Sequence, residues 1–421
     1  MTINNEHKKL NVPNLRFPEF KGEWEEHRLS ELLDFKNGLN PKPDKFGKGI
    51  KFISVMDILN NAVITYDCIK SSVDVTEKEL SDFSVEKGDI LFQRSSETLE
   101  DVGRANAYMD DKTAVFGGFV IRGKKKGEYD PQYFNYLLRS PFARKRIIPM
   151  GAGAQHFNIG QEGLSKVKLH FANIEEQKKI GKMLSLLDER IATQHKIIED
   201  LKKLKSAIIE KVFCSPNKKN PMCRIEGFEQ ALSTYKMCDF SSRIATKNKD
   251  SKCSLVLTIA AQYGLVNQES FFNKSVASEN LTGYYLLHKG EFAYNRSYSA
   301  GYDWGAVKRL DNYDEGVLST LYICFKINET IVDSDYLTYY FESTKWHRGL
   351  SDIAGEGARN HGLLNVSITD YFNTKHRFPV IEEQKAIAKM LNTITEKERK
   401  ATLLGECYQK QKQYLLRQMF I

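Results

Sequence analysis

The sequence predicts an α+β fold, in which two tandem, pseudo-symmetric, mainly-β domains are separated by two long antiparallel coiled-coil helices. Three observations predict it. One segment occurs twice, as IEEQKKIGKML from residue 174 and as IEEQKAIAKML from residue 381, 207 residues later. Each copy continues without an insertion to a phenylalanine, Phe213 or Phe420. Short β-rich runs precede each copy, so the repeat indicates an internal duplication.

The bulk composition bounds the fold and the class of protein. At 421 residues the chain is too long for one core, so two or three domains are expected. Hydrophobic residues make up 41% and charged residues 28%, which excludes wholesale disorder. The net charge of +8 is a modest indication of a polyanionic partner.

Cysteine usage and the N-terminus indicate a cytoplasmic protein. The seven cysteines are spread along the chain without a CxxC pair, which favours reduced thiols over disulfides or zinc. Residues 1–14 are polar and lack the apolar core of a signal peptide. No run approaches the roughly 18 apolar residues of a membrane span, so no membrane association is expected.

Strand-like runs alternate with turn residues in the first half of the chain. Strands are expected at 51–58, 62–69, 88–95 and 113–122, and a helix at 131–147, followed by a loop at 151–160. The same order returns after Phe213, because 254–260, 289–297, 317–325, 334–344 and 355–362 answer 51–57, 87–95, 115–123, 131–141 and 151–158. The frame repeats while the loop residues differ, which is typical of one fold with two ligands.

The repeated segment predicts a helix of about 40 residues, roughly 60 Å long. Its first copy places a largely apolar seam at Leu184, Leu187, Ile191, Gln194, Ile198, Leu201, Lys205, Ile208 and Val212. The second copy places a weaker seam at Ile387, Met390, Ile394, Lys397, Ala401, Leu404, Tyr408, Gln411 and Leu415. Each helix could pack on its own domain, but equal lengths and related patterns favour mutual antiparallel packing.

No catalytic or cofactor-binding motif is present in the sequence. The P-loop, the dinucleotide fingerprint, His-Glu-x-x-His and Gly-x-Ser-x-Gly are all missing, and the histidines lack metal-ligand spacing. We therefore expect a chain that is not an enzyme and binds no cofactor or metal itself.

Polar loops recur at matching places in the two halves. Arg, Asn and Gln can make bidentate contacts with purine edges, and Lys and Arg can neutralise phosphates. The candidate DNA-binding residues are Gln93, Arg94, Ser95, Arg104, Lys124, Lys125, Gln155, His156 and Asn158 in the first half, and Asn295, Arg296, Ser297, Tyr298, Lys308, Arg359, Asn360 and His361 in the second. The duplicated placement of Arg94 and Arg296 makes them the preferred pair.

With its tandem domains, each closed by Ala/Pro-x-Ile-Glu-Glu-Gln and a long helix, the chain resembles the specificity (S) subunits of type I restriction-modification systems from about Arg16 onward. The resemblance implies a polar tail at 1–14, target recognition domains at 15–171 and 215–373, and spacer helices at 172–214 and 374–421. Each domain would read one half of a bipartite site in double-stranded DNA, and the helices would fix the distance between the half-sites.

The resemblance also implies partner subunits. Two modification subunits would methylate adenine with S-adenosylmethionine, and two restriction subunits would translocate and cleave DNA with ATP and Mg²⁺. The Ile-Glu-Glu-Gln turns are interpreted as held by an outside partner and the seam as held by its twin. The candidate docking and spacer residues are Ile174, Glu175, Glu176, Gln177, Leu184, Leu187, Ile191, Ile198, Ile381, Glu382, Glu383, Gln384, Leu391 and Ile394.

Two other functions stay open at this point. The chain could be a coiled-coil scaffold whose two β domains bind protein ligands, or a methyltransferase with degenerate motifs. Salt-dependent DNA binding would favour the specificity subunit over the scaffold, and binding of S-adenosylmethionine by this chain alone would favour the enzyme.

Overall fold

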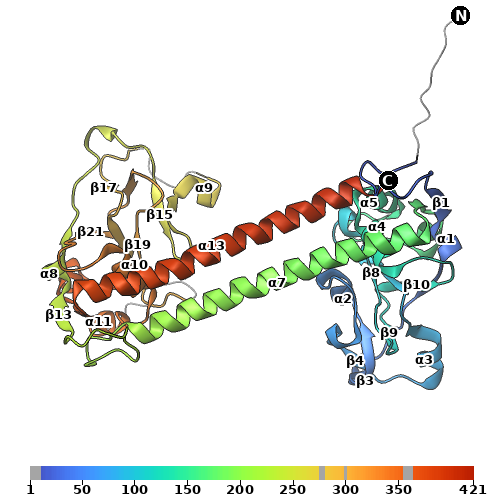
Figure 1. Cartoon of the computed structure of the whole chain (residues 1–421), viewed down its shortest axis with the longest axis horizontal. Coiled ribbons are helices and arrows are strands. Elements are labelled where there is room, and N and C mark those ends of the chain that lie inside the picture. Colours follow the sequence, from blue (N-terminus) through green and yellow to red (C-terminus); the bar gives the residue numbers. More distant parts are fainter. Residues whose placement is uncertain (1–10, 275–279, 298–300, 354–363) are drawn as a thin grey trace, which may run out of the picture. The chain divides into compact units, whose positions relative to one another are not determined.

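The computed structural model describes residues 11–274, 280–297, 301–353 and 364–421. The chain divides into unit 1, Met1–Lys196 with Thr402–Ile421, and unit 2, Ile197–Ala401. The two long helices are α7 (Ile174–Val212) and α13 (Ile381–Gln418), and each has a part in both units (Figure 1). We call residues 11–173 domain 1 and residues 214–380 domain 2.

Domain 1 is built on a four-stranded antiparallel sheet of order β2-β10-β6-β8: Leu33–Asn37, Val120–Lys125, Ile90–Gln93 and Ala105–Ala107. A second sheet has the order β4-β3-β9-β5: Ser72–Val73, Phe46–Ile53, Ala114–Phe116 and Ser84–Val85. Two further pairs are β1 (Glu25–Arg28) with β12 (Lys168–Phe171), and β7 (Ser95–Ser96) with β11 (Phe157–Asn158).

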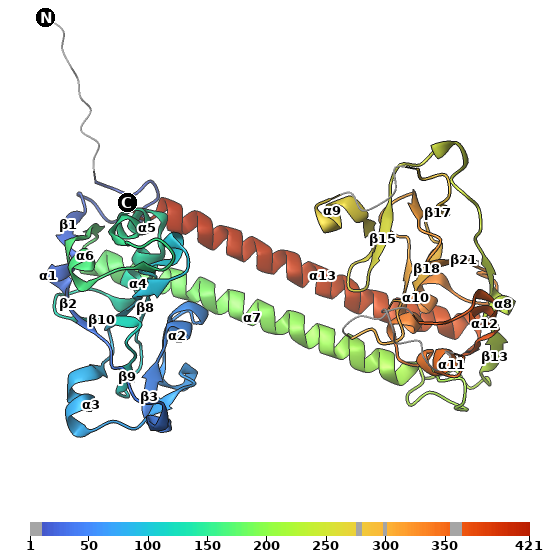
Figure 2. The same ribbon diagram turned by 180° about the vertical axis from the view of Figure 1, so that it is seen from behind.

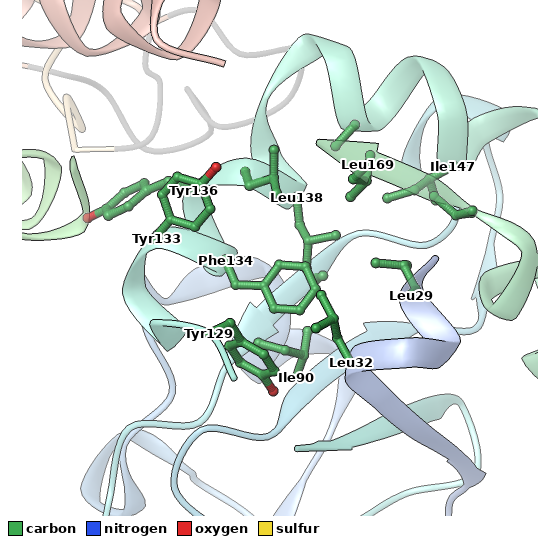
Figure 3. Close-up of a cluster of buried hydrophobic side chains, with 14 of the residues drawn as sticks. Leu29, Leu32, Ile90, Tyr129, Tyr133, Phe134, Tyr136, Leu138, Ile147 and Leu169 are labelled. Atoms are coloured by element: carbon green, nitrogen blue, oxygen red, sulfur yellow. The ribbon is translucent and has the colours of Figure 1, made fainter. Parts of the chain in front are cut away.

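Short helices cover these sheets: α1 (Leu29–Leu32), α2 (Val55–Asn60), α3 (Glu77–Phe83), α4 (Pro131–Arg139), α5 (Pro141–Ile147) and α6 (Gln161–Lys166). Helix α4 begins where the Asp130 carboxylate accepts a hydrogen bond from the Tyr133 N–H, with Pro131 at its first position. Its Phe134 side chain is fully buried, and Figure 3 shows that ring in the middle of the domain 1 core beside Leu32 and Tyr129.

Domain 2 repeats this architecture. Its main sheet has the order β14-β21-β18-β19: Ser241–Arg243, Ile323–Ile327, Phe292–Asn295 and Ala306–Arg309. The pairs are β13 (Ser233–Lys236) with β22 (Lys375–Phe378), β15 (Leu257–Ala260) with β16 (Gly264–Asn267), and β17 (Tyr285–His288) with β20 (Glu315–Leu318). Its helices are α8 (Met237–Phe240), α9 (Gln268–Phe272), α10 (Ser334–Glu342), α11 (His347–Ser351) and α12 (Ile368–Asn373).

The predicted duplication is confirmed by the strand orders. The order β14-β21-β18-β19 reproduces β2-β10-β6-β8, and β13 pairs with β22 as β1 pairs with β12. Helix α10 likewise follows its sheet as α4 does, and the Asp333 carboxylate caps it through the Tyr336 N–H. The two domains therefore share one frame.

The phenylalanine that closes each repeat enters the core of a domain. The ring of Phe420, which follows α13, lies 6.4 Å from that of Trp24 and 5.5 Å from that of Tyr133 in domain 1. The ring of Phe213, which follows α7, lies 5.0 Å from that of Tyr336 in domain 2. Each long helix therefore begins at one domain, and the phenylalanine that follows its end lies in the core of the other domain.

The Ile-Glu-Glu-Gln turn is anchored inside domain 1, not presented to a partner. Glu176 is 0% exposed, and its carboxylate accepts hydrogen bonds from the Arg16 guanidinium at 2.8 and 2.7 Å. The buried Gln177 amide accepts from the Asp130 N–H at 3.0 Å and donates to the Ala172 carbonyl at 2.7 Å. The turn thereby joins α7 to the N-terminal segment and to the cap of α4.

Domain 2 repeats these contacts at the start of α13. The Glu383 carboxylate pairs with Arg224 at 2.7 Å, and the Gln384 amide accepts from the Asp333 N–H and donates to the Pro379 carbonyl. The interpretation of these turns as partner-facing is therefore wrong for the buried Glu176, Gln177, Glu383 and Gln384. Exposed side chains remain at Glu175 and Glu382, and Ile174 and Ile381 are half-buried.

The predicted seam of α7 coincides with its buried face, whereas that of α13 is right at some positions and wrong at others. Every predicted position of α7 is buried or half-buried. In α13 the sheltered positions are Ile387, Leu391, Ile394, Glu398, Ala401, Gly405, Tyr408, Lys412, Leu415 and Met419, while the predicted Lys397, Leu404 and Gln411 are exposed and Met390 is only half-buried. The sheltered face lies one residue later than predicted at Glu398, Gly405 and Lys412, because polar or small residues occupy these positions where the heptad pattern expects apolar ones.

The two helices pack against each other in antiparallel directions within each unit. In unit 1 the Lys412 ammonium lies 2.5 Å from the Asp188 carboxylate, and Gln409 lies 3.1 Å from His195. In unit 2 the Lys205 ammonium lies 3.6 Å from the Glu398 carboxylate. In each unit the part of α7 lies alongside the part of α13, as Figure 2 shows. Residue numbers rise along α7 as they fall along α13. The long helices therefore pack on each other, and their ends also pack in the domain cores. Both packing alternatives considered from the sequence thus occur together.

Several sequence-based boundaries differ from the structure. Residues 55–58 are helical because Ser54 and Asp57 form a capping box that starts α2. Residues 62–69 hold a 3₁₀ turn at Tyr66–Cys68 in place of a strand. Residues 11–14 are attached to the domain, since the Trp24 N–H donates to the Asn11 carbonyl. Strand β22 belongs to domain 2, because it pairs with β13, although it lies beyond residue 373.

The helix-start ion pair yields a stability prediction. Arg16→Met leaves the buried Glu176 carboxylate without its guanidinium, so the free energy of unfolding should fall by about 3–5 kcal/mol. Urea unfolding followed by circular dichroism measures this, and hydrogen exchange should speed up in the first turns of α7. Arg28→Met, which changes an exposed arginine of β1, should stay within about 0.5 kcal/mol. Equal effects of the two variants would contradict the anchoring role.

Candidate nucleic-acid interface

Arg94 joins three segments at one end of the main sheet of domain 1. Its N–H donates to the Phe119 carbonyl at 2.9 Å, and its guanidinium donates to the Gly118 carbonyl at 3.4 Å. Its own carbonyl accepts from the Ile159 N–H at 2.9 Å. The loops at 93–96 and 155–159, both predicted to bind DNA, are therefore brought together beside the turn at 117–119.

Arg296 joins the equivalent segments of domain 2. Its guanidinium donates to the Leu321 carbonyl at 3.3 and 3.1 Å and to the Val366 carbonyl at 3.2 Å. Its own carbonyl accepts from the Leu364 N–H at 2.9 Å. Both arginines thus brace loop backbones, a role that the sequence did not reveal, although their identical place in the repeat was a signal for it.

The loop tips of domain 1 expose polar side chains around this brace. The Ser95 hydroxyl is hydrogen-bonded to the Asn158 side-chain oxygen, which ties β7 to β11. Asn158, Gln155 and His156 are exposed to solvent. Gln93 is different, because its side chain is only 5% exposed and donates to the Ser95 carbonyl at 2.9 Å. Its prediction as a base-contacting residue is wrong, and it shapes the loop from below.

Two predicted lysines of domain 1 lie away from these loops. Lys124 and Lys125 are at the far end of β10 from the turn at 117–119. The Lys124 ammonium is 3.7 Å from Glu86, and that of Lys125 lies 4.8 Å from the centre of the Tyr129 ring. Residues five or six positions along a strand are about 17–20 Å apart, so these lysines do not join the loop cluster.

Arg104 lies in a cationic recess beside the first loop. It lines a cavity of about 480 Å³ together with Arg139, Arg144 and Glu100, and its carbonyl accepts from the Gln93 N–H at 2.7 Å. Burial lowers the pKa of the Arg144 guanidinium to about 10. The lowered pKa means that burial makes the charged form of Arg144 less favourable. A phosphate bound nearby would offset this cost.

In domain 2, too, some of the predicted residues lie in the loop cluster and others lie away from it. The Asn295 side chain accepts from the Ser297 N–H at 3.0 Å, which orders the first loop. Lys308 sits on β19 and lines a cavity with Lys205 and Glu398 of the long helices, so it does not join the loop cluster. Tyr298, Arg359, Asn360 and His361 lie outside the described residues, and their predicted DNA contacts stay predictions.

Among the residues that the structure describes, no three His, Cys, Asp or Glu side chains gather as a metal-binding group. In the same ranges no helix is long and apolar enough to cross a membrane.

Known proteins that are similar to this chain are type I specificity subunits. Residues 21–203 match the family described as type I restriction modification DNA specificity domain. Over 404 residues the chain is 24% identical to the type I restriction enzyme MjaVIII specificity subunit of Methanocaldococcus jannaschii, covering 90% of this chain and 87% of that protein. Residues 21–203 thus carry a type I specificity domain, and nearly the whole chain is similar to type I specificity subunits.

Further relatives agree with this assignment. The putative type I restriction enzyme MjaX specificity subunit of Methanocaldococcus jannaschii is 28% identical over 212 residues, and the match spans 49% of each chain. A crystal structure of the type I S subunit from M. genitalium has a TM-score of 0.56 at 17% identity, covering 97% of this chain and 99% of that one. The fold is therefore that of specificity subunits.

The similarity to type I specificity subunits gives the broad class of the protein. Specificity subunits of type I systems are not catalytic, so this chain is not an enzyme. The scaffold and methyltransferase alternatives are accordingly set aside.

The brace of domain 2 of this specificity subunit yields a second prediction. Arg296→Ala removes the hydrogen bonds to Leu321 and Val366, so backbone exchange at 319–322 and 364–366 should speed up at least tenfold, as measured by hydrogen–deuterium exchange. Arg296→Lys should not restore protection, because an ammonium cannot reach two carbonyls with a planar fork. Lys326→Ala, an exposed position of β21, is the matched control and should leave exchange unchanged.

Proposed function

We propose that this specificity subunit reads a bipartite site in double-stranded DNA, with one half-site per domain. The observation that carries the proposal is the braced loop cluster, present in both domains with different polar residues around it. Ser95, Gln155 and Asn158 surround the brace of domain 1, whereas Asn295 and Ser297 stand beside that of domain 2. One frame with two sets of hydrogen-bonding groups suits two half-sites of different sequence.

The charge of the loop region supports the same proposal. Base contacts specify a DNA sequence, but phosphate contacts supply most of the affinity. The recess of Arg104, Arg139 and Arg144 adjoins the first loop and offers a cationic site for a backbone phosphate. Binding by domain 1 would therefore weaken as the salt concentration rises.

The long helices are proposed to set the number of unspecified base pairs between the half-sites. Helix α7 has 39 residues and α13 has 38, each as an unbroken helix of about 58 Å. Their pairing is fixed by charged residues within the seam, Asp188 with Lys412 and Lys205 with Glu398. A paired helix of fixed register suits a spacer, since a lone helix would bend more readily.

The partners follow from this role. We propose that two modification subunits dock on the assembly and methylate adenine with S-adenosylmethionine, and that two restriction subunits use ATP and Mg²⁺ to translocate and cleave DNA. This chain itself would bind no cofactor and would work in the cytoplasm. The exposed Glu175 and Glu382 are the residues of the two matching helix starts that remain available for docking.

A loop variant tests the reading of separate half-sites. Co-expressed with its modification subunits, Asn158→Ala should alter or relax only one half-site of the methylated sequence, since it changes hydrogen-bonding groups in domain 1 alone. Long-read methylation sequencing of cells carrying the complex gives both half-sites at once. Lys166→Ala, an exposed position of α6, should leave the sequence unchanged. Equal changes in both half-sites would contradict one domain reading one half-site.

A paired insertion tests the spacer role. Seven residues inserted after Leu201 of α7 and seven after Ala401 of α13 keep the seam in phase, and lengthen each helix by about 10 Å. The spacer should grow by about three base pairs at roughly 3.4 Å each, with both half-sites unchanged. The same seven residues placed after Asn220, in the exposed segment at the start of domain 2, should not change the spacer. An unchanged spacer in the paired insertion would overturn the proposal.

A further inference from the structure

A large apolar side chain projects from the same turn of each domain. Phe119, between β9 and β10, is 68% exposed, and Leu321, between β20 and β21, is 58% exposed. The two positions are 202 residues apart, the same interval that relates Arg94 to Arg296. Exposed single hydrophobic residues are common, but a matched pair at one place of a duplicated frame is not explained by chance exposure.

We call the turns that carry Phe119 and Leu321 the tips. Hydrogen bonds fix the backbone of each tip, whereas its apolar side chain is exposed to solvent. The Phe119 carbonyl accepts from the Arg94 N–H, and the Leu321 carbonyl accepts from the Arg296 guanidinium at 3.1 Å. Behind Phe119 the turn is pressed onto the domain, because a Cβ added at Gly118 would overlap the Asn40 side chain and one at Gly117 would lie 2.6 Å from the Phe52 ring. Each tip is therefore a rigid apolar projection.

The tips lie among the polar loops that we propose to read DNA. Arg94 bonds directly to the turn of Phe119 and to Ile159, which follows the loop of Asn158. Beside Phe119 a recess of about 400 Å³ is lined by Phe46, Phe52 and Met56, and is mostly apolar. An apolar projection next to base-reading groups has the composition of a wedge that enters a base stack.

We propose that Phe119 and Leu321 insert into the DNA base stack of the half-site read by their own domain, and unstack a base step there. This rests on the proposed function. Proteins that kink DNA insert Phe and Leu between base steps, and enzymes that modify a base take it out of the stack. An unstacked step beside the target would lower the cost for a modification subunit to extrude that base.

The difference between the two tips favours DNA over a protein as the occupant. If the tips contacted two copies of one modification subunit, each tip would meet the same protein surface. The same side chain would then be expected in both domains. The two half-sites of a bipartite sequence differ, and so do the tips, an aromatic ring in one domain and a branched aliphatic chain in the other.

The test uses the complex of this chain with its modification subunits and duplexes that carry 2-aminopurine next to the target base of either half-site. The base fluoresces more when unstacked. The wild-type complex should raise the fluorescence in both duplexes. Phe119→Ala should cut the rise at least fivefold at the half-site of domain 1 only, and lower affinity about tenfold, the loss of one stacking contact. Leu321→Ala should act only at the other half-site.

Two control variants distinguish a wedge in the DNA from a protein contact or a general loss of apolar surface. Met222→Ala removes a 73% exposed side chain outside the loop clusters and should change nothing, and Phe119→Tyr should retain the rise. Bound DNA with an undiminished rise in Phe119→Ala would overturn the wedge while leaving the proposed function intact. Loss of the modification subunits from the purified Phe119→Ala complex would also overturn it, since the tip would then be a protein contact. A wild-type complex that binds no specific DNA would overturn the proposed function itself.

Discussion

The buried glutamate at the start of each long helix is the interaction on which the rest of the structure depends. A carboxylate with no exposed surface is tolerated only when a charge partner and hydrogen bonds replace its water, and Arg16 supplies two such bonds to Glu176. The neighbouring Gln177 ties the same turn to Asp130, which caps α4, so the helix cannot turn without disturbing the domain core. Arg224, Glu383, Gln384 and Asp333 do the same for α13. The direction of each long helix is thereby set by its own domain.

The other end of each helix is fixed by packing instead of charge. Phe213 and Phe420 are about 1% exposed, in aromatic clusters around Tyr336 and Trp24. Each domain thus holds the start of one helix by an ion pair and the end of the other by a buried ring. Between these anchors the seam combines apolar residues with charged pairs, and the charged pairs stabilise only one register, because a shift by one heptad would leave Asp188 and Lys412 unpaired. A seam with charged pairs, anchored at both ends, is consistent with a helix pair of fixed register.

The sequence predicted the duplicated frame because its signals are local and periodic. The repeat, the order of the strands and the α7 seam could be read from spacing alone. The α13 seam could not, since Glu398 and Gly405 occupy positions where periodicity expects apolar residues. The buried helix-start residues were missed for a related reason: Glu and Gln read as solvent-facing unless their partners are known, and Arg16 lies 160 residues before Glu176. The loop clusters were predicted as sets of residue types, but composition does not distinguish the exposed Asn158 from the buried Gln93, which lie at the two ends of one hydrogen-bonded group.

The bracing arginines explain how the frame can stay constant while its loops change. Within the described ranges, the guanidinium groups of Arg94 and Arg296 donate to backbone carbonyls, so the residues they hold can be replaced without loss of these hydrogen bonds. Side chains at Ser95, Asn158, Phe119 and Leu321 then vary over a fixed backbone. Arg94 and Arg296, which the sequence predicts as base readers, support the loop backbones in this structure, and exposed polar side chains such as that of Asn158 are their neighbours. An arginine that can make bidentate hydrogen bonds with guanine can also donate to backbone carbonyls. Whether it lies among loop backbones decides between these two roles.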